Sequence, residues 1–309
     1  MAYPAYIQGV EEMLNGAVGI YGRVSQRAVS EFVLVVNNGL MHAYLQDGLD
    51  TYEVRYQSGG HLIVEVDSSR YPDSLPPMPA PQTHDGAVVQ AEAIPQADMG
   101  DYIDVLGVYT PRAKNAVPYA TIGETDVELR IEASILSANL GYANSGVTQR
   151  LRLVGMDEVN YDEIIPGQTD AAMWSYALYR LAFGYYETGG DSPSANYLLD
   201  ARDFRDMYGA DLVFMLTDLP YSYCGLGFIG GDPGDAAVGY SIEHWYCSGS
   251  TSYSVQHEMG HNMGACHDRA NSSISIRAFH VMQIIHMVTS SLPDLFILLW
   301  RMLVQNVNE

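Results

Sequence analysis

Basic residues are scarce in this chain. Its 309 residues include 15 lysines and arginines against 37 aspartates and glutamates, which gives a net charge of −22. Such a charge repels nucleic-acid phosphates and anionic membrane surfaces over most of the molecule. We therefore expect no nucleic acid among its partners.

Long apolar runs are also missing. The longest, Leu295 to Trp300, is far too short to cross a bilayer, so we predict no transmembrane segment. Residues 1–15 contain no basic region followed by an apolar one, so no signal peptide is visible in this sequence.

Cysteine is limited to Cys224, Cys247 and Cys266, which all lie in the last third of the chain. This distribution argues against a scaffold built on disulfides but permits one bridge. The remaining composition, 48% hydrophobic and 17% charged, is that of a globular chain with room for one large domain and a smaller one.

The first part of the chain has the pattern of antiparallel strands. Residues 31–67 are β-rich runs broken by Asn37-Asn38-Gly39, Asp47-Gly48 and Gly59-Gly60, which favour hairpin turns. We predict a small antiparallel β unit within residues 1–71. Prolines then become frequent, so residues 72–100 are predicted to form an extended, accessible linker.

From residue 101 the pattern changes to alternating strands and helices. Apolar runs at 103–109, 150–155 and 211–217 predict strands, while helical spacing at 124–140 and 171–183 predicts helices. This order indicates an α/β domain, over residues 101–275, with a mostly parallel twisted sheet.

Residues 257–268, which read HEMGHNMGACHD, carry the candidate chemistry. On a helix, His257 and His261 lie on one face, where two neutral imidazoles can bind one divalent metal. Gly264 lets the backbone turn out of the helix, so that His267 can return as a third ligand. Three nitrogen ligands leave the fourth position of Zn²⁺ for water, as in catalytic sites. We therefore predict one catalytic zinc ion.

Glu258, beside the first ligand, is the predicted general base. Zinc lowers the pKa of its bound water toward roughly 7 and polarises a carbonyl, and Glu258 is placed to take the proton of that water. The predicted reaction is peptide-bond hydrolysis. A thermolysin-like site with a distant glutamate ligand is disfavoured, because His267 already fills that place.

This stretch resembles the active site of the metzincin zinc endopeptidases. An aspartate directly after the third histidine, here Asp268, resembles the pattern of their reprolysin (adamalysin) branch, including its bacterial reprolysin-like members. Upstream, IDVLGVYTPRA resembles the first strand of the family, GADLVFMLTD an inner strand and CGLGFIGG the edge strand that lines the substrate. The resemblance implies a metzincin-like catalytic domain with an active-site helix. It also implies a peptide bound in extended form along Gly225, Leu226 and Gly227.

The same resemblance implies a secreted zymogen, in which the β unit is the tail of a propeptide. We expect a monomer that acts on a protein or peptide substrate. No cysteine precedes Cys224, so the thiolate that occupies zinc in some zymogens cannot come from upstream residues.

A disulfide and a second metal are further expectations. Cys224 and Cys247 flank the edge strand and the loop before the active-site helix, which predicts a bridge in an exported protein and two buried thiols otherwise. Scattered carboxylates, Asp101 and Glu128 among them, could hold a structural Ca²⁺.

The residues after Asp268 depart from the family. They contain no glycine and no tyrosine, although the whole chain has 29 and 23, and they lack the I-M-x-Y sequence that forms the methionine turn beneath the metal in metzincins. Residues 276–309 are therefore either a natural amphipathic helix or a tail read in a shifted frame, with the shift near residues 273–277. In the shifted frame, the codons of residues 295–304 permit the missing turn.

The sequence favours a zinc-dependent metalloendopeptidase. The alternative is a zinc-binding but inactive protein, which keeps a peptide-binding groove and lacks the methionine turn.

Overall fold

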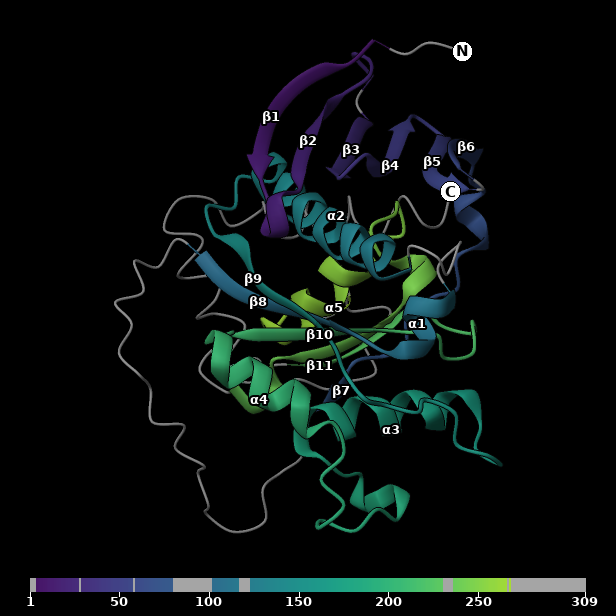
Figure 1. The fold of residues 1–309 in the computed structure, drawn as a ribbon, viewed down its shortest axis with the longest axis vertical. Coiled ribbons are helices and arrows are strands. Elements are labelled where there is room, and N and C mark those ends of the chain that lie inside the picture. The colour runs from purple at the N-terminus through teal and green to yellow at the C-terminus, as the bar shows by residue number, and fades with distance from the viewer. Residues whose placement is uncertain are drawn as a thin grey trace.

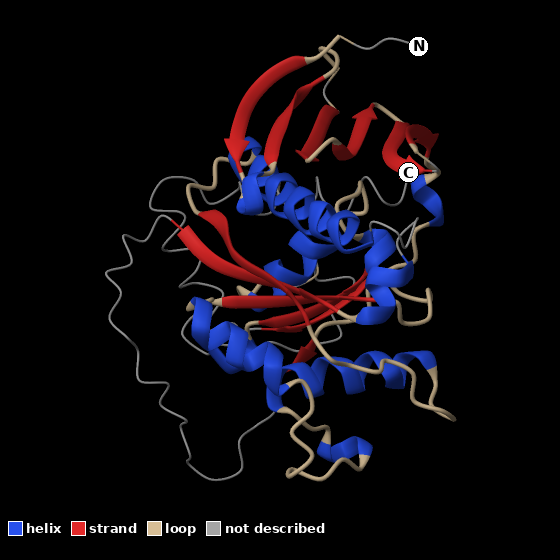
Figure 2. Ribbon diagram, in the orientation of Figure 1, coloured by secondary structure: helices blue, strands red, loops and turns tan. Residues whose placement is uncertain are grey.

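The computed structural model describes residues 4–27, 29–57, 59–79, 102–116, 123–229, 236–265 and 267. These residues form two six-stranded sheets and five α-helices (Figure 1). The predicted α/β class is confirmed. In Figure 2 a helical layer separates the two sheets.

The first sheet is an antiparallel meander in which each strand pairs with the next in the chain. The predicted turns connect its last four strands, and Asn38, Gly39, Gly48 and Gly59 adopt the positive φ angles that such turns require. Two strands that the sequence pattern did not predict precede them. The strands are β1 (Tyr6–Glu12), β2 (Val18–Arg23), β3 (Ser30–Asn37), β4 (Leu40–Asp47), β5 (Asp50–Gln57) and β6 (Gly60–Glu65).

The second sheet is mostly parallel, as predicted, and has the order β7-β11-β12-β10-β8-β9. Of its neighbouring pairs, β11 with β12 is the antiparallel one. Its strands are β7 (Met78–Pro79), β8 (Tyr102–Tyr109), β9 (Arg150–Glu158), β10 (Leu212–Thr217), β11 (Gly225–Ile229) and β12 (Tyr240–His244). Strand β10 is buried along its whole length, as expected for a strand with helices on both faces.

Helices cover both faces of the second sheet. Helices α3 (Asp170–Phe183) and α4 (Leu199–Tyr208) lie on the face remote from the first sheet, while α2 (Gly123–Asn144) and α5 (Ser254–Asn262) lie between the sheets (Figure 1). The short α1 (Pro111–Ala116) follows β8. Helix α5 therefore belongs to the layer that the first sheet covers.

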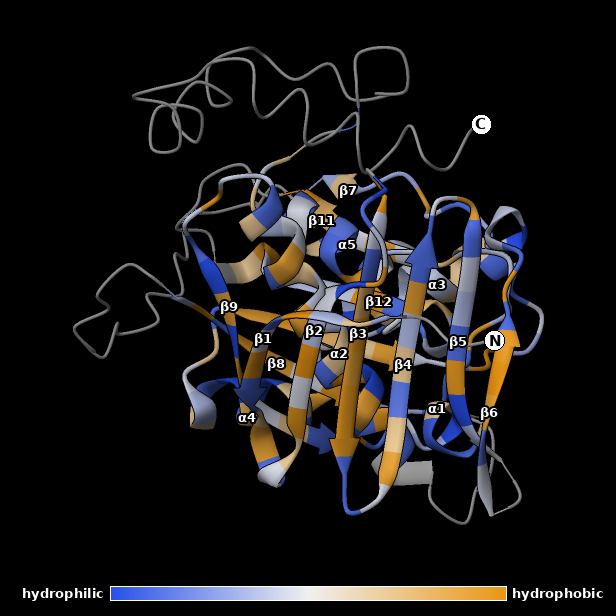
Figure 3. Ribbon diagram, turned by 90° about the horizontal axis from the view of Figure 1, so that it is seen from above, coloured by the Kyte–Doolittle hydropathy of each residue, from blue (hydrophilic) through white to orange (hydrophobic). Residues whose placement is uncertain are grey.

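Helix α2 is apolar on two opposite faces, because it is packed against both sheets. Leu129, Leu136 and Leu140 join the core of the first sheet. Ile131 and Ile135 join the core beneath the second sheet, together with two residues of α5. Figure 3 looks onto the first sheet, in which β3 is apolar along much of its length. The two sheets thus share one helix as a common core element.

The prediction that an accessible linker begins at residue 72 is wrong for its first residues. Strand β7 pairs in parallel with β11, where Met78 is opposite Phe228 and Pro79 is opposite Ile229. Prolines are tolerated here because β7 is an edge strand, whose outward N–H groups have no partner strand to bind. Residues 80–101 of the predicted linker lie outside the described residues.

The residues from 268 onward, including Asp268, also lie outside the described residues. The two interpretations of the tail therefore stay predictions. No helix within the described ranges is both long and apolar enough to span a membrane.

Candidate metal centre

Three histidine side chains meet at the end of α5. His257 and His261 lie one turn apart on the helix, and the helix ends at Asn262. Gly264 follows with a φ of 91°, which residues other than glycine rarely adopt. The chain then returns, so that His267 faces the two histidines of the helix. The turn is closed by backbone hydrogen bonds from Gly264 to His261 (2.9 Å) and from Ala265 to Gly260 (2.8 Å).

The three Nε2 atoms form a nearly equilateral triangle. His261 Nε2 lies 3.1 Å from that of His257 and 3.2 Å from that of His267, and the third side measures 3.3 Å. Nitrogen ligands about 2.0–2.1 Å from a tetrahedral zinc ion are separated by about 3.3 Å. The donor set therefore fits zinc with one position left open. Within the described ranges no other group of three or more histidine, cysteine or acidic side chains converges in this way.

Two of the three imidazoles, those of His257 and His261, are favoured in the neutral form that a metal requires. Burial, followed by the two neighbouring histidines, holds the pKa of His257 well below its ordinary value. Burial likewise lowers the pKa of His261 to about 4. His261 Nδ1 lies 2.7 Å from the carbonyl oxygen of Ala265, and a proton on Nδ1 leaves the Nε2 lone pair for the metal.

Glu258 is fully buried between α5 and the sheet, on the side of β11. An added Cβ on Gly225 would lie 2.6 Å from its Oε1, and one on Gly227 would lie 3.2 Å from its Oε2. Glycine at these two positions therefore gives the carboxyl group its room. Neither oxygen has a partner that meets ordinary hydrogen-bond geometry among the described residues. Burial raises the pKa of Glu258 to about 8, and the Ser74 side chain and the Gly227 N–H oppose this shift.

The predicted substrate strand and cysteine pair also lie beside α5. Gly225, Leu226 and Gly227 form most of β11. This strand lies between β12 and β7, so the edge that faces away from β12 is paired with β7 at Phe228 and Ile229. The structure joins Cys224 and Cys247 in a disulfide with Cα atoms 5.6 Å apart. This bond ties the start of β11 to the loop that leads into α5.

Some contacts at this centre have no signal in the sequence. Asn262 Nδ2 lies within 3.0 Å of the carbonyl oxygens of Phe228, Val238 and Tyr240, and so fixes the end of α5 to β11 and to the segment that enters β12. Ser74, which the sequence places in a linker, approaches Glu258. Of the two residues named for calcium, Asp101 lies outside the described residues and Glu128 lies on α2.

A family model for metallo-peptidase family M12 matches residues 115–286, which is more than half of the chain. The chain belongs to this family. The resemblance to bacterial reprolysin-like metzincins is thereby confirmed. The match includes the three histidines, Glu258 and β11 of this M12 metallopeptidase.

Curated relatives carry the name peptidyl-Asp metalloendopeptidase. The protein of Stenotrophomonas maltophilia is 28% identical over 229 residues, which cover 72% of this chain and 48% of the relative. That of Pseudomonas aeruginosa is 30% identical over 181 residues, which cover 53% of this chain and 25% of the relative. This M12 metallopeptidase thus spans less than half the length of these relatives. Metalloproteinase-II from Bacteroides fragilis has a TM-score of 0.43 and 14% identity, with 82% of this chain and 73% of that chain covered.

Proposed function

We propose that this M12 metallopeptidase is a zinc-dependent endopeptidase, in which His257, His261 and His267 hold the metal and Glu258 is the general base. The observation that carries the proposal is the triangle of Nε2 atoms, 3.1 to 3.3 Å apart, beside a buried carboxyl group. A structural zinc site closes all four positions with protein ligands, whereas three nitrogens leave one position open.

The side chains of this centre have separable tasks in hydrolysis. Zinc, when bound, supplies a water of lowered pKa and polarises the scissile carbonyl. Glu258 takes a proton on a carboxylate oxygen and passes it to the leaving amine. Burial keeps bulk water away from this carboxyl group, and the glycines of β11 leave it the space that it occupies.

The proposed substrate is an extended peptide that adds to the edge of β11 along Gly225, Leu226 and Gly227. Backbone hydrogen bonds to a strand edge bind a peptide without regard to its side chains. Since the curated relatives are named for peptidyl-Asp bonds, peptides that contain aspartate are the first series to test.

We also propose that the protein is exported and acts as a monomer, with the first sheet serving as a propeptide. The Cys224–Cys247 disulfide supports export, because such bonds persist in oxidising compartments. A structural calcium ion stays part of the proposal.

The competing proposal is a zinc-binding protein without activity. It is favoured by the missing methionine turn, because ligands that lack their supporting shell are loosely placed. Hydrolysis of a generic protein substrate, with and without a chelator, separates the two proposals. Chelator-sensitive cleavage supports the endopeptidase, and zinc binding without cleavage supports the alternative.

Replacing His261 by alanine should remove most of the zinc. His261 is one of only three nitrogens in the proposed ligand set, so its loss leaves two. Metal analysis of the purified full chain should give one zinc per unmodified chain and much less than one for His261→Ala. The matched control is His61→Ala, because His61 lies in the first sheet, where its Nε2 accepts a hydrogen bond from the Met41 amide. An unchanged zinc content in His261→Ala would contradict the assignment of His261 as a zinc ligand.

Replacing Gly225 by alanine should lower the rate of hydrolysis and leave zinc in place. The new Cβ would lie 2.6 Å from Glu258 Oε1 and 2.8 Å from Ser254 Oγ, so the carboxyl group must move. A displacement of about 1 Å in a catalytic group can cost on the order of 10²-fold in rate. Gly60→Ala is the control, since no atom lies within 4 Å of its added Cβ. Equal turnover in both variants would show that the position of Glu258 does not depend on this glycine.

A further inference from the structure

A second carboxyl group, that of Glu243, is buried beside Glu258 under helix α5. Glu243 lies on β12, is fully buried and has no task in the proposed hydrolysis. In the register of the sheet it is opposite Gly225 of β11. An added Cβ on Gly225 would lie 2.6 Å from Glu258 Oε1. Because residues directly opposite each other in an antiparallel pair share a face of the sheet, Glu243 lies on the face that Glu258 covers.

No side chain of β11 separates the two carboxyl groups at this position, since Gly225 has none. Cβ atoms of directly opposed residues are about 4.5–5.5 Å apart, so the side chain of Glu243 starts close to the space that the Glu258 carboxyl group fills. On its other side, Glu243 is paired with Leu216 of β10, which belongs to the apolar core under α5. The two glutamates are therefore neighbours in a space closed to solvent.

The hydrogen bonds of Glu243 leave one of its oxygens without a partner. Its Oε1 accepts a hydrogen bond from Ser241 Oγ at 2.8 Å. Its Oε2 is buried and has no partner among the described residues, as is also true of both carboxyl oxygens of Glu258. A protonated carboxyl group has one O–H to donate, whereas an ionised one only accepts. A proton on Glu243 Oε2 therefore supplies a donor beside an acceptor that has none.

The electrostatics of this space favour a proton on Glu243. Burial raises the pKa of Glu243 well above its ordinary value, the Ser241 hydroxyl opposes this shift, and the charge of Glu258 adds to it. Like charges close together in a buried space disfavour ionisation of both groups, so one of the two keeps its proton. The neighbours that the strand register and the charges place around Glu243 are Ser241, Gly225, Leu216 and Glu258, and none of them is a cation.

We propose that Glu243 is a positioning residue for Glu258, and that its O–H holds Glu258 Oε1 while Oε2 stays free to take the proton in hydrolysis. The proposal rests on the proposed role of Glu258 as general base. Oε1 lies on the side of Gly225, to which Glu243 is opposite, whereas Oε2 lies on the side of Gly227. Hydrogen bonds of catalytic groups often tighten when substrate binds, so the contact should be closest in the zinc-loaded protein with substrate.

The test compares the unmodified full chain, loaded with zinc, with Glu243→Leu and Glu243→Gln. Leucine fills a similar space and donates nothing, whereas glutamine restores a neutral donor. Loss of a hydrogen bond to a charged group costs on the order of 10- to 100-fold. We expect kcat for an aspartate-containing peptide to fall by about this factor in Glu243→Leu with KM unchanged, and Glu243→Gln to restore most of the rate. A residue that only fills space would give equal kcat in the two variants, and that result would overturn the proposal.

NMR of isotope-labelled glutamate carboxyl carbons gives a measurement that does not depend on turnover. The signals of Glu243 and Glu258 are those that disappear in Glu243→Gln and Glu258→Gln. At neutral pH, Glu243 should have the signal of a protonated carboxyl group. The Glu258 signal should shift in Glu243→Leu and stay near its original position in Glu243→Gln, because only leucine removes the donor.

An ionised Glu243 at neutral pH would overturn the proposal, and so would a Glu258 signal that is the same in both variants. The protonation state is read from the unmodified chain and Glu243→Gln, so it is measurable where Glu243→Leu does not fold. If the unmodified chain cuts no peptide, the endopeptidase proposal fails, whereas the NMR comparison still decides whether Glu243 bonds to Glu258. The two failures can thus be told apart.

Discussion

Replacing Glu258 by glutamine is expected to remove peptide hydrolysis while the zinc content stays at one per chain. Glutamine has nearly the shape of glutamate, so it fits the space above Gly225 and Gly227. Its amide cannot accept the proton of the attacking water, and loss of a general base costs about 10²–10⁴-fold in rate. The zinc ligands stay in place, because Glu258 lies on the same helix but is not one of the three histidines that hold the metal.

The measurement pairs metal analysis with hydrolysis of an aspartate-containing peptide. Both are made on the full chain. The control is Glu187→Gln, which makes the same chemical change at an exposed position in the turn Glu187–Gly189. Full turnover in Glu258→Gln would identify another base, and loss of zinc would show that Glu258 supports the fold of the site.

The metal centre could be predicted from the sequence because its parts are close in the chain. Two histidines four residues apart share a helix face in any helix, and a glycine three residues later permits the return of His267. These are local rules of backbone geometry. Strands β8, β9 and β10 and helices α2 and α3 were likewise predictable, since each has its own apolar period, whereas α1, α4 and β12 were not predicted.

The pairing of residues 73–79 with β11 could not be predicted by the same rules. The prolines of this stretch are typical of a linker, and the rules assign a strand from alternation and β-branched residues, which it lacks. Its conformation is set by β11, some 150 residues further on, through the Leu75 and Cys224 amides. Pairing over such a distance leaves no mark on the local pattern.

The second apolar face of α2 was also hidden. The periodic residues of the predicted helix include Ile135 and Leu136 together, and the chain gives no separate signal that Leu136 packs on a different sheet from Ile135. Docking of the first sheet explains both faces. It also explains why charged residues can be buried on α2, since the partner carboxylate comes from β5.

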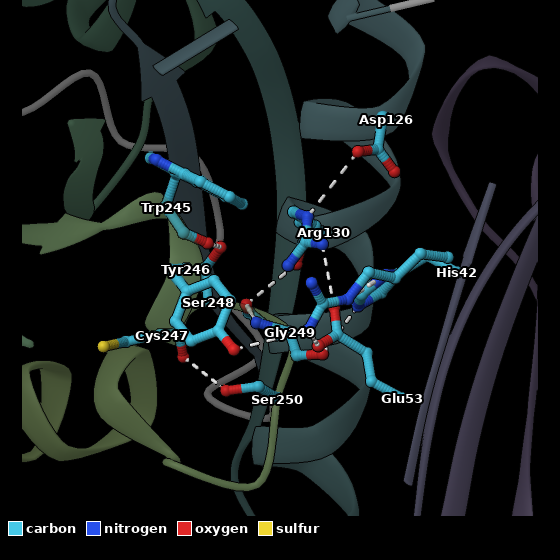
Figure 4. A network of polar contacts seen from close by, with 12 residues as sticks. His42, Glu53, Asp126, Arg130, Trp245, Tyr246, Cys247, Ser248, Gly249 and Ser250 are labelled. Atoms are coloured by element: carbon cyan, nitrogen blue, oxygen red, sulfur yellow. Dashed lines mark hydrogen bonds and ion pairs between the residues drawn. The ribbon is translucent and has the colours of Figure 1, made fainter. Parts of the chain in front are cut away.

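Arg130, on α2, is fully buried between the sheets, and its charge is balanced from the first sheet. Its Nη2 donates to Glu53 Oε1 at 2.8 Å, while Asp126 lies 3.8 Å from its Nε (Figure 4). His42 contacts the same carboxylate at 4.0 Å and lies 2.7 Å from the carbonyl oxygen of Gly249, in the loop before α5. Burial opposes ionisation of Glu53, but Arg130, His42 and Arg55 outweigh it and lower its pKa. This contribution to stability is present above pH of about 4.5 and is lost as the pH falls through the lowered value.

Replacing Glu53 by alanine should therefore destabilise the full chain strongly. The variant leaves Arg130 buried with Asp126 alone at 3.8 Å, and removal of one partner of a buried ion pair costs about 3–5 kcal/mol. Denaturant unfolding at neutral pH measures this free energy. Glu65→Ala is the control, since Glu65 is exposed on β6 of the same sheet and should change the free energy of unfolding by no more than about 0.5 kcal/mol. The triple variant Glu53→Leu, Arg130→Met and Asp126→Asn removes the three charges and should recover most of the loss, because the cost lies in an unpaired buried charge and not in the missing pair. A loss in Glu53→Ala no greater than in Glu65→Ala would show that the ion pair does not hold the first sheet on α2.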